Sequence, residues 1–443
     1  MKYFVIVLLT SMNIGLSAFG DSQNWPQFRG VDSRGVAAKS TLAEDWSATE
    51  NVAWKVDVPG RGWSSPIVWD DKIFLTTVVT EGETAVAKRG LYFGGNRKNP
   101  SDSVHHWVVL CLSLKDGKEQ WRREVHIGKP KKSLHIKNSY ASETPVTDGQ
   151  HVYAYFGNLG LFCFTMNGEQ KWKKEFDALN TRYDWGTAAS PTLHDDRIYI
   201  VNDNDEDSTL MAIDKSNGNT IWSVARDEKS NWATPFVWEN DQRTEIITPG
   251  TGKFRSYDIK GNLLYEFGGG SSITIATPYA ANGLLYVSSG YVLDRKKPVF
   301  ALRPGAQGDI SLAADETSNQ HIAWCQKQAG PYNPSTIVVD DLLYVLYDRG
   351  FFACFDAKSG EEVYEKKRIP DGRAFTASPW SDGKNIYCLN EYGTTFVIQA
   401  GREFQILRSN SLDKDELCMA TPAIASNKLL LRTDTRLYCI ESK

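Results

Sequence analysis

The sequence predicts an all-β protein, an eight-bladed β-propeller made of four-stranded antiparallel blades. Three observations support this fold class. The apolar segments are short and accompany 35 Gly, 14 Trp and 19 Tyr, a composition typical of many brief strands and tight turns. One sequence pattern recurs every 43 to 46 residues over much of the chain, which is the length of a four-stranded blade. The last copy lacks a fourth strand, which a segment near the N-terminus can supply.

Each copy starts with a Ser-Pro or Thr-Pro dipeptide, followed by an alternating apolar strand, a turn and a second strand. The first residues of seven dipeptides are Ser65, Thr144, Ser190, Thr234, Thr277, Ser378 and Thr421. Ser335 begins an eighth copy without the Pro, because residues 337–345 repeat the apolar pattern of residues 67–75. Asx and Gly residues occupy the first turns, where two-residue hairpins need positive φ. We therefore expect eight similar antiparallel units.

The eighth blade is predicted to close the ring with both ends of the chain. The last copy ends after its third strand, at residues 438–440, whereas the other copies continue through a second, Gly-containing turn into a fourth strand. Residues 51–58 precede the first copy and have the alternation and the Trp, Trp54, of an outer strand. We expect this strand to pair with the last one, which leaves no unpaired break in the ring.

The N-terminus predicts export. Lys2, an apolar stretch and the small-residue site at 18–20 have the organisation of a signal peptide over residues 1–20. The apolar stretch is shorter than the roughly 20 residues that span a bilayer. The mature chain is therefore expected to have no transmembrane segment and to be periplasmic or secreted. Residues 21–50 would form an N-terminal extension, and residues 51–443 the propeller.

Composition and charge exclude several functional classes. The 50 basic and 54 acidic residues give a net charge of −4, and no Lys/Arg run is present, so we expect no nucleic-acid partner. Four of the seven cysteines, Cys111, Cys163, Cys354 and Cys439, share one position of the repeat with Ala and Ser in other copies. Such a position predicts small buried thiols, with a disulfide or a reactive thiol as the alternative.

The second turn and the strand after it resemble a known repeat. Residues 212–222, AIDKSNGNTIW, resemble the A-x-D-x-x-x-G-x-x-x-W signature of pyrroloquinoline-quinone-type (PQQ-like) propeller repeats. Residues 111–121 and 354–364 are similar. In this signature the Gly ends a hairpin and the aromatic packs between adjacent blades. The resemblance covers residues 51–443 and implies an eight-bladed, BamB-like propeller.

A second resemblance is local. Residues 24–30, NWPQFRG, are similar to a segment of exported propeller proteins of planctomycete-type bacteria. It implies that the extension crosses or packs on the propeller, with Trp25 and Phe28 as packing anchors. Glycan stacking by these two rings is the alternative.

The resemblance leaves three functions open. We expect an exported, non-catalytic scaffold or binding protein similar to BamB, the propeller subunit of outer-membrane protein assembly. It would be a monomer with a protein partner in the cell envelope and no cofactor. The first alternative is an alcohol or sugar dehydrogenase that holds PQQ and calcium on the propeller axis. The second is a carbohydrate-binding propeller, favoured if Trp25, Trp63 or Trp185 is exposed on one face.

The long spacings of the first and fifth copies mark two insertions, where candidate binding residues are expected because functional groups gather on long loops. The insertion of the fifth copy, residues 303–320, is predicted to be a polar loop without a recognisable site. Residues 80–106 and 126–141 could form a basic rim that captures an acidic partner; the alternative is a solvated loop with balancing acids. The candidates for this binding face are Arg97, His105, His106, Lys131, Lys132, His135 and Trp185. Glu143 and Asp348 lie near predicted strand ends and could face the central funnel.

An acidic run at residues 203–207 is the candidate metal site. Asp203, Asp205 and Asp207 place hard oxygens close together, as calcium requires. The run lacks the Gly and terminal Glu of an EF-hand loop, and a solvated turn is the alternative. We predict no catalytic residue, because the chain has no GxSxG, HExxH or phosphate-binding loop.

Overall fold

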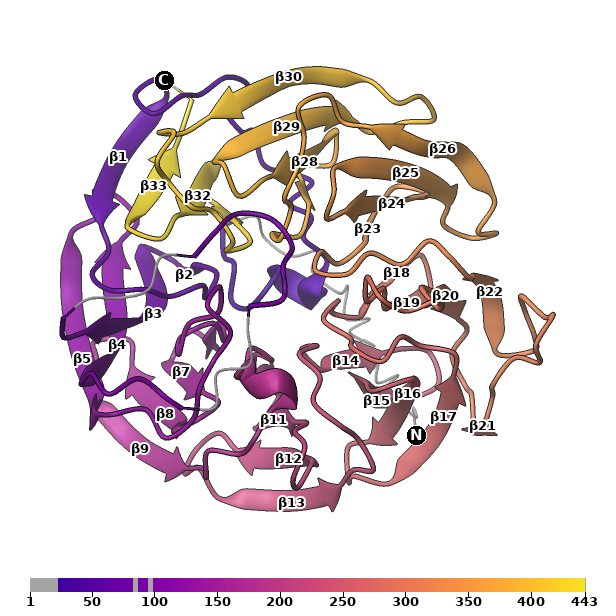
Figure 1. The fold of residues 1–443 in the computed structure, drawn as a ribbon, viewed down its shortest axis with the longest axis horizontal. Coiled ribbons are helices and arrows are strands. Elements are labelled where there is room, and N and C mark those ends of the chain that lie inside the picture. Colours follow the sequence, from indigo (N-terminus) through magenta and orange to yellow (C-terminus); the bar gives the residue numbers. More distant parts are fainter. Residues whose placement is uncertain (1–22, 83–86, 95–98, 443) are drawn as a thin grey trace, which may run out of the picture.

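A computed structural model describes residues 23–82, 87–94 and 99–442. Eight antiparallel sheets surround a central axis, which confirms the predicted eight-bladed propeller (Figure 1). The predicted signal peptide, residues 1–20, lies outside the described residues. Within the described ranges, no helix is long and apolar enough to cross a membrane.

The first four blades follow the predicted copies of the repeat. Blade 1 contains β2 (Ile67–Trp69), β3 (Lys72–Thr80), β4 (His105–Ser113) and β5 (Glu119–Gly128). Blade 2 contains β6 (Val146–Thr147), β7 (His151–Phe156), β8 (Gly160–Thr165) and β9 (Gln170–Glu175). Blade 3 contains β10 (Thr192–His194), β11 (Arg197–Asn202), β12 (Thr209–Asp214) and β13 (Thr220–Ala225). Blade 4 contains β14 (Phe236–Glu239), β15 (Thr244–Pro249), β16 (Lys253–Asp258) and β17 (Leu263–Gly268).

The other four blades complete the ring. Blade 5 contains β18 (Tyr279–Ala281), β19 (Leu284–Ser288), β20 (Val299–Leu302) and β22 (Ile322–Gln326). Blade 6 contains β23 (Ile337–Val339), β24 (Leu342–Tyr347), β25 (Phe351–Asp356) and β26 (Glu362–Arg368). Blade 7 contains β27 (Trp380–Ser381), β28 (Asn385–Leu389), β29 (Thr394–Gln399) and β30 (Ile406–Ser411). Blade 8 contains β31 (Ala423–Ala425), β32 (Lys428–Arg432), β33 (Arg436–Ile440) and β1 (Val52–Asp57).

The ring closes in blade 8, as predicted. β1 pairs antiparallel with β33, with Val52 opposite Ile440 and Trp54 opposite Cys439. A buried guanidinium adds a second closure between blades 8 and 1. Arg432 donates from Nη1 to the carbonyl oxygen of Ser64 (2.8 Å) and from Nη2 to that of Thr76 (2.8 Å). Strand pairing and side-chain hydrogen bonds thus join the two ends of the chain.

The repeat signature latches five of the described blades to the next one, which confirms the predicted packing of its aromatic residue. Trp172, on the outer strand of blade 2, donates from Nε1 to the carbonyl oxygen of Lys215 in blade 3 (3.0 Å). Its ring covers Gly218, where φ is +78° and a Cβ would lie 2.6 Å from the ring. Only Gly fits this turn, because it tolerates both the positive φ and the close approach. The same latch is made by Trp54, Trp121, Trp222 and Trp324.

The insertion of blade 5 does more than form the predicted polar loop. Within it, β21 (Gly308–Asp309) pairs in parallel with β17, so that the sheet of blade 4 gains a fifth strand. Ile310 is buried beside this pairing, and its N–H donates to the carbonyl oxygen of Glu266 (3.0 Å). One apolar side chain therefore anchors an otherwise polar insertion to its neighbouring blade.

The cysteines are buried and unpaired. All seven lie in the described chain, and none forms a disulfide. Burial raises the pKa of Cys111 to about 12, which keeps its thiol protonated near neutral pH. This agrees with the expectation of small apolar side chains at the shared repeat position.

The N-terminal extension closes one end of the axis. Trp25 is buried and exchanges two backbone hydrogen bonds with Val68 of blade 1 (2.8 and 2.9 Å). The chain then passes through the 3-10 helix η1 (Val31–Ser33) near the centre of the ring (Figure 1). The buried guanidinium of Arg29 donates to the carbonyl oxygen of Thr336 in blade 6 (2.8 Å). The extension therefore ties inner strands of distant blades together.

The repeated Ser and Thr residues form a hydrogen-bonded ring around the axis. In six pairs, the backbone N–H of one residue donates to the hydroxyl oxygen of its equivalent in the next blade, at 2.9 to 3.1 Å. The pairs form two runs of three: Ser65–Thr144, Thr144–Ser190 and Ser190–Thr234, and then Thr277–Ser335, Ser335–Ser378 and Ser378–Thr421. We call these eight residues the hydroxyl ring.

Removing one hydroxyl of this ring should destabilise the protein. In Ser190→Ala the buried N–H of Thr144 loses its acceptor, and a buried unsatisfied donor costs about 1–3 kcal/mol. The free energy of unfolding, measured by urea denaturation with tryptophan fluorescence, should fall by that amount. The matched control is Ser223→Ala on the exposed edge of β13, where a change within about 0.5 kcal/mol is expected. Equal losses in both variants would contradict a stabilising ring.

Candidate functional site

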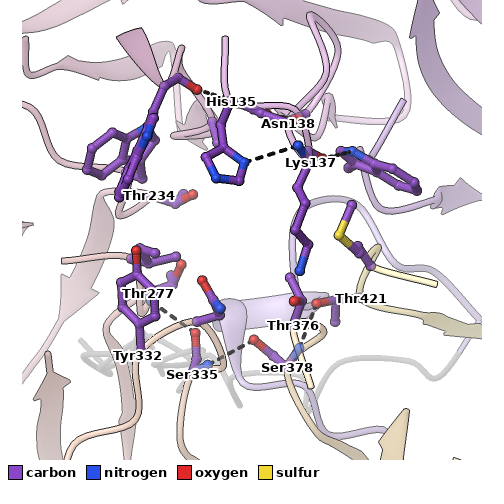
Figure 2. Close-up of a pocket in the computed structure, with 18 of the residues that line it drawn as sticks. His135, Lys137, Asn138, Thr234, Thr277, Tyr332, Ser335, Thr376, Ser378 and Thr421 are labelled. Atoms are coloured by element: carbon purple, nitrogen blue, oxygen red, sulfur yellow. Dashed lines mark hydrogen bonds between the residues drawn. The ribbon is translucent and has the colours of Figure 1, made fainter. Parts of the chain in front are cut away.

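A cavity of about 260 Å³ lies on the propeller axis (Figure 2). Its floor is the hydroxyl ring, which supplies Thr144, Ser190, Thr234, Thr277, Ser335, Ser378 and Thr421. Phe28 of the N-terminal extension also lines the cavity. In the sequence these Ser and Thr residues mark the start of each repeat; that they build the floor of a cavity becomes clear only in the structure.

Aromatic side chains form the wall of the cavity. We call this set the aromatic wall: Trp63, Trp185, Trp232 and Tyr332. The indole N–H of Trp63 donates to the carbonyl oxygen of Lys137 (2.7 Å), and that of Trp232 donates to Gly186 (2.7 Å). Trp185 packs on Trp232, with 5.9 Å between ring centroids. Polar anchors and ring contacts therefore fix this wall before any ligand arrives.

The aromatic wall comes from equivalent places in the repeat. Each of its residues lies on the segment just before the Ser or Thr of the next copy, within five residues of it. Trp185 follows the 3-10 helix η2 (Arg182–Asp184). Trp232 and Tyr332 were not singled out in the sequence analysis. The sequence signal that points to them is an aromatic residue that recurs just before the Ser or Thr at the start of a copy.

Polar groups face the floor from the segment between β5 and β6 (Figure 2). Nδ1 of His135 accepts the N–H of Lys137 (3.0 Å), so the ring proton belongs on Nε2, which lies 3.3 Å from the carbonyl oxygen of Tyr92. The ammonium of Lys137 donates to the carboxylate of Glu391 (2.5 Å) and to the carbonyl oxygen of Gly90 (2.9 Å). Among the described residues that line the cavity, the one ammonium is therefore already neutralised by a buried carboxylate.

The insertion of blade 1 crosses the mouth of the cavity. Arg89 donates to the carbonyl oxygens of Glu391 in blade 7 (3.1 Å) and Glu416 (2.8 Å). A few residues later, Phe93 packs against Tyr183 (5.0 Å between centroids) and Trp185 (5.6 Å) beside blade 3. Residues 87–94 thus connect opposite sides of the ring, and the predicted functional insertion does reach the axial site.

Two buried acids fasten loops next to the cavity. Glu143 accepts the hydroxyl of Thr187 (2.6 Å) and the N–H of Gly157 (3.1 Å), and burial raises its pKa to about 7. Asp348 accepts the N–H groups of Tyr332 and Asn333 (3.0 Å each), and burial raises its pKa to about 6. Neither lines the cavity. These carboxyls, expected to face the funnel, position loops instead.

The predicted binding face divides between two places. His135 and Trp185 both line the axial cavity, with 5.4 Å between their ring centroids. Lys131 is exposed, and Lys132 donates to the side-chain oxygen of Asn180 (2.6 Å). Arg97 lies outside the described residues. The structure therefore brings together only two of the candidates at the axis.

The two neighbouring histidines of blade 1 have opposite environments. His105 is buried against the rings of Trp107 and Tyr140, and burial lowers its pKa. His106 lies between the carboxylates of Glu81 (3.0 Å) and Glu124 (2.6 Å), whose hydrogen bonds raise its pKa. Carboxylates therefore offset the positive charge in this part of the expected basic rim. This is the arrangement expected for the alternative, a solvated loop with balancing acids.

The three candidate calcium ligands have separate partners. Both oxygens of Asp203 accept hydrogen bonds from the buried guanidinium of Arg226 (2.7 and 3.1 Å). Asp205 accepts the N–H and hydroxyl of Ser230, and Asp207 is exposed. Among the residues that the structure describes, no group of three or more His, Cys, Asp or Glu is arranged to hold a metal ion. The calcium site stays a prediction.

Comparison with known families identifies the repeat. A family model described as outer membrane protein assembly factor BamB matches residues 105–366, more than half of the chain. The chain belongs to this family. No curated protein sequence matches it significantly.

Solved structures share the fold at low sequence identity. BamB from Moraxella catarrhalis is 13% identical, with a TM-score of 0.54 over 81% of this chain and 99% of that one. A quinohemoprotein alcohol dehydrogenase from Pseudomonas putida HK5 is 10% identical, with a TM-score of 0.59 over 96% of this chain and 81% of that one. A computationally designed protein is 9% identical, with a TM-score of 0.57 over 88% and 99% of the two chains. At these identities the likeness concerns the fold alone.

The donor set of the cavity does not fit PQQ with calcium. PQQ carries three carboxylates, and calcium needs several hard oxygens, usually including carboxylates. The described lining residues include the amides of Asn138 and Asn333 but no Asp, Glu or Arg. The lining ammonium, that of Lys137, is paired with Glu391. The cavity therefore lacks both the acidic ligands for the ion and free cations for the quinone carboxylates.

The buried carboxyl of Glu143 predicts a pH dependence of stability. Its pKa is about 7 in the folded protein and 4.5 when unperturbed. Between these values the folded state holds a proton that the unfolded chain has released, so stability falls as pH rises. Glu143→Gln should flatten this decline in urea titrations between pH 4.5 and 7. The control is the exposed Glu365→Gln, which should keep the wild-type slope. An unchanged slope in Glu143→Gln would contradict the elevated pKa.

Proposed function

We propose that the chain is an exported, non-catalytic binding propeller of the cell envelope, with a partner protein docked at the mouth of the axial cavity. The observation that supports this proposal most directly is a group of exposed apolar side chains at this mouth. We call this group the mouth patch: Phe93, Tyr183 and Leu293. Their exposed fractions are 55%, 37% and 77%. Clustered exposed apolar residues mark interaction sites, and aromatic residues are enriched at interface cores.

The mouth patch has rigid support. Phe93 and Tyr183 contact each other and also Trp185 of the aromatic wall. Leu293 follows Val292, which packs in the same apolar cluster as Trp185 and Trp232. The rings of Phe93 and Tyr183, held in this way, lose little conformational freedom on binding. The patch is therefore suited to bind an apolar segment of another protein.

The family and the N-terminal sequence support an envelope partner. The family description, outer membrane protein assembly factor, concerns proteins that work with other proteins in the envelope. Residues 1–20 have the organisation of a signal peptide. We therefore propose a periplasmic or secreted monomer that assists assembly of envelope proteins. The donor set of the cavity gives no support to the quinoprotein alternative.

Site-specific photo-crosslinking in the native host tests the docking proposal. Phe93→p-benzoylphenylalanine should give a crosslink to one predominant envelope protein on illumination. The same amino acid at Ile221, exposed by 43% on the outer strand β13, is the matched control and should give little product.

The crosslink should also depend on the rest of the patch. Adding Tyr183→Ala and Leu293→Ala to the crosslinking variant should reduce its yield at least threefold, because the partner loses apolar contacts. Equal crosslinking at positions 93 and 221, or a yield that the added substitutions do not change, would contradict the proposal.

A further inference from the structure

The floor of the axial cavity presents hydroxyl groups that can still donate. All seven lining residues of the hydroxyl ring are at least nine-tenths buried. Six of the ring oxygens accept a backbone N–H, and each hydroxyl carries one hydrogen to donate. Within the described chain, no protein acceptor receives a hydrogen bond from these hydroxyls. A buried donor without a partner is unfavourable, so the floor is suited to a ligand rich in acceptor oxygens.

The wall offers ring faces. The polar ends of Trp63 and Trp232 are used by the protein, and the indole nitrogen of Trp185 is buried and therefore not available to a ligand in the cavity. A ligand that matches this wall has C–H surfaces for the rings, while its oxygens meet the hydroxyl ring of the floor. Aromatic side chains with a polar end suit such mixed ligands.

The charge of the cavity favours a neutral ligand. Lys137 contributes an ammonium, and Glu391, which is 1% exposed at its side chain, neutralises it at 2.5 Å. Glu391 also accepts the N–H of Gly90 (2.7 Å) and the hydroxyl of Thr376 (2.6 Å). This network holds the pair together, so the ammonium is not available to a second anion. Burying an unpaired ionic ligand here would cost free energy.

From these three properties we infer that the axial cavity binds a neutral sugar. The C–H face of the sugar ring would lie against Trp185 and Trp232. Its hydroxyl and ether oxygens would accept hydrogen bonds from the hydroxyl ring. The inference goes beyond the proposed docking of a protein, because it rests on the interior of the cavity and not on the mouth patch.

The test is a calorimetric titration of the mature protein with neutral and charged sugars. The neutral probes are glucose, galactose, mannose, N-acetylglucosamine and their common disaccharides; the charged ones are glucuronate and glucosamine. At least one neutral sugar should bind saturably, and its charged counterpart should bind at least tenfold more weakly. Absence of saturable binding by every neutral sugar up to about 50 mM, or equal affinity for the charged counterpart, would overturn the inference.

Variants of the cavity locate the binding. Trp185→Ala should weaken it at least tenfold, because the stacking surface is lost. Ser335→Ala should weaken it about threefold. Phe351→Ala, at an exposed aromatic residue on β25 of blade 6, is the control and should leave affinity unchanged. Unchanged affinity in both cavity variants would overturn the inference.

Two further measurements keep the outcome interpretable. If Trp185→Ala does not fold, Trp185→Phe keeps an aromatic ring but gives a smaller stacking face, so a reduced affinity is still expected. The crosslink from position 93 should persist in Ser335→Ala, which separates failure of sugar binding from failure of partner docking.

Discussion

The hydrogen bond from a backbone N–H in one blade to a Ser or Thr hydroxyl in the next is the interaction on which this structure depends. The innermost strands converge at the axis and are short, with only two residues in β6 and β27. The hydrogen bonds between strands do not extend to the residues just before these short strands, so the backbone N–H groups there have no acceptor within the sheet. A buried N–H needs an acceptor. The hydroxyl of the neighbouring blade supplies it. One residue type per repeat therefore joins the blades and forms the floor of the axial cavity.

Segments outside the repeat make the symmetric ring asymmetric around the axial cavity. The N-terminal extension contributes Phe28 to the cavity, and the insertion of blade 1 crosses the mouth from Glu391 to Tyr183. Solvent-exposed apolar groups collect on this insertion and on the adjacent loops. This arrangement resembles other scaffolds in which rigid strands carry variable loops that bind ligands and partners. The proposed partner and the inferred sugar use neighbouring but separate surfaces of the same end.

Local features of the repeat could be predicted from the sequence, whereas convergence at the axis could not. The turn Gly and the outer-strand Trp recur at a fixed spacing, so packing of the Trp between blades follows from the motif, whereas only the structure shows that Trp172 covers Gly218 of the next copy. The pairing of Val52 with Ile440 follows from counting strands. By contrast, Arg89 and Glu391 meet across 302 residues, and no periodicity fixes the course of the insertion that brings them together. The ion pair between Asp203 and Arg226 could not be predicted from the sequence either, because Arg226 lies at the end of another strand.

The central claim is that the donor set of the axial cavity suits a neutral ligand and does not fit PQQ with calcium, although the fold is shared with a quinohemoprotein dehydrogenase. Equilibrium dialysis of the mature protein with PQQ and calcium tests this most directly, combined with dye-linked oxidation of alcohols and sugars. The account predicts no saturable PQQ binding up to about 100 μM, which corresponds to a binding free energy weaker than roughly −5.5 kcal/mol. Stoichiometric, calcium-dependent binding with substrate-dependent dye reduction would contradict it.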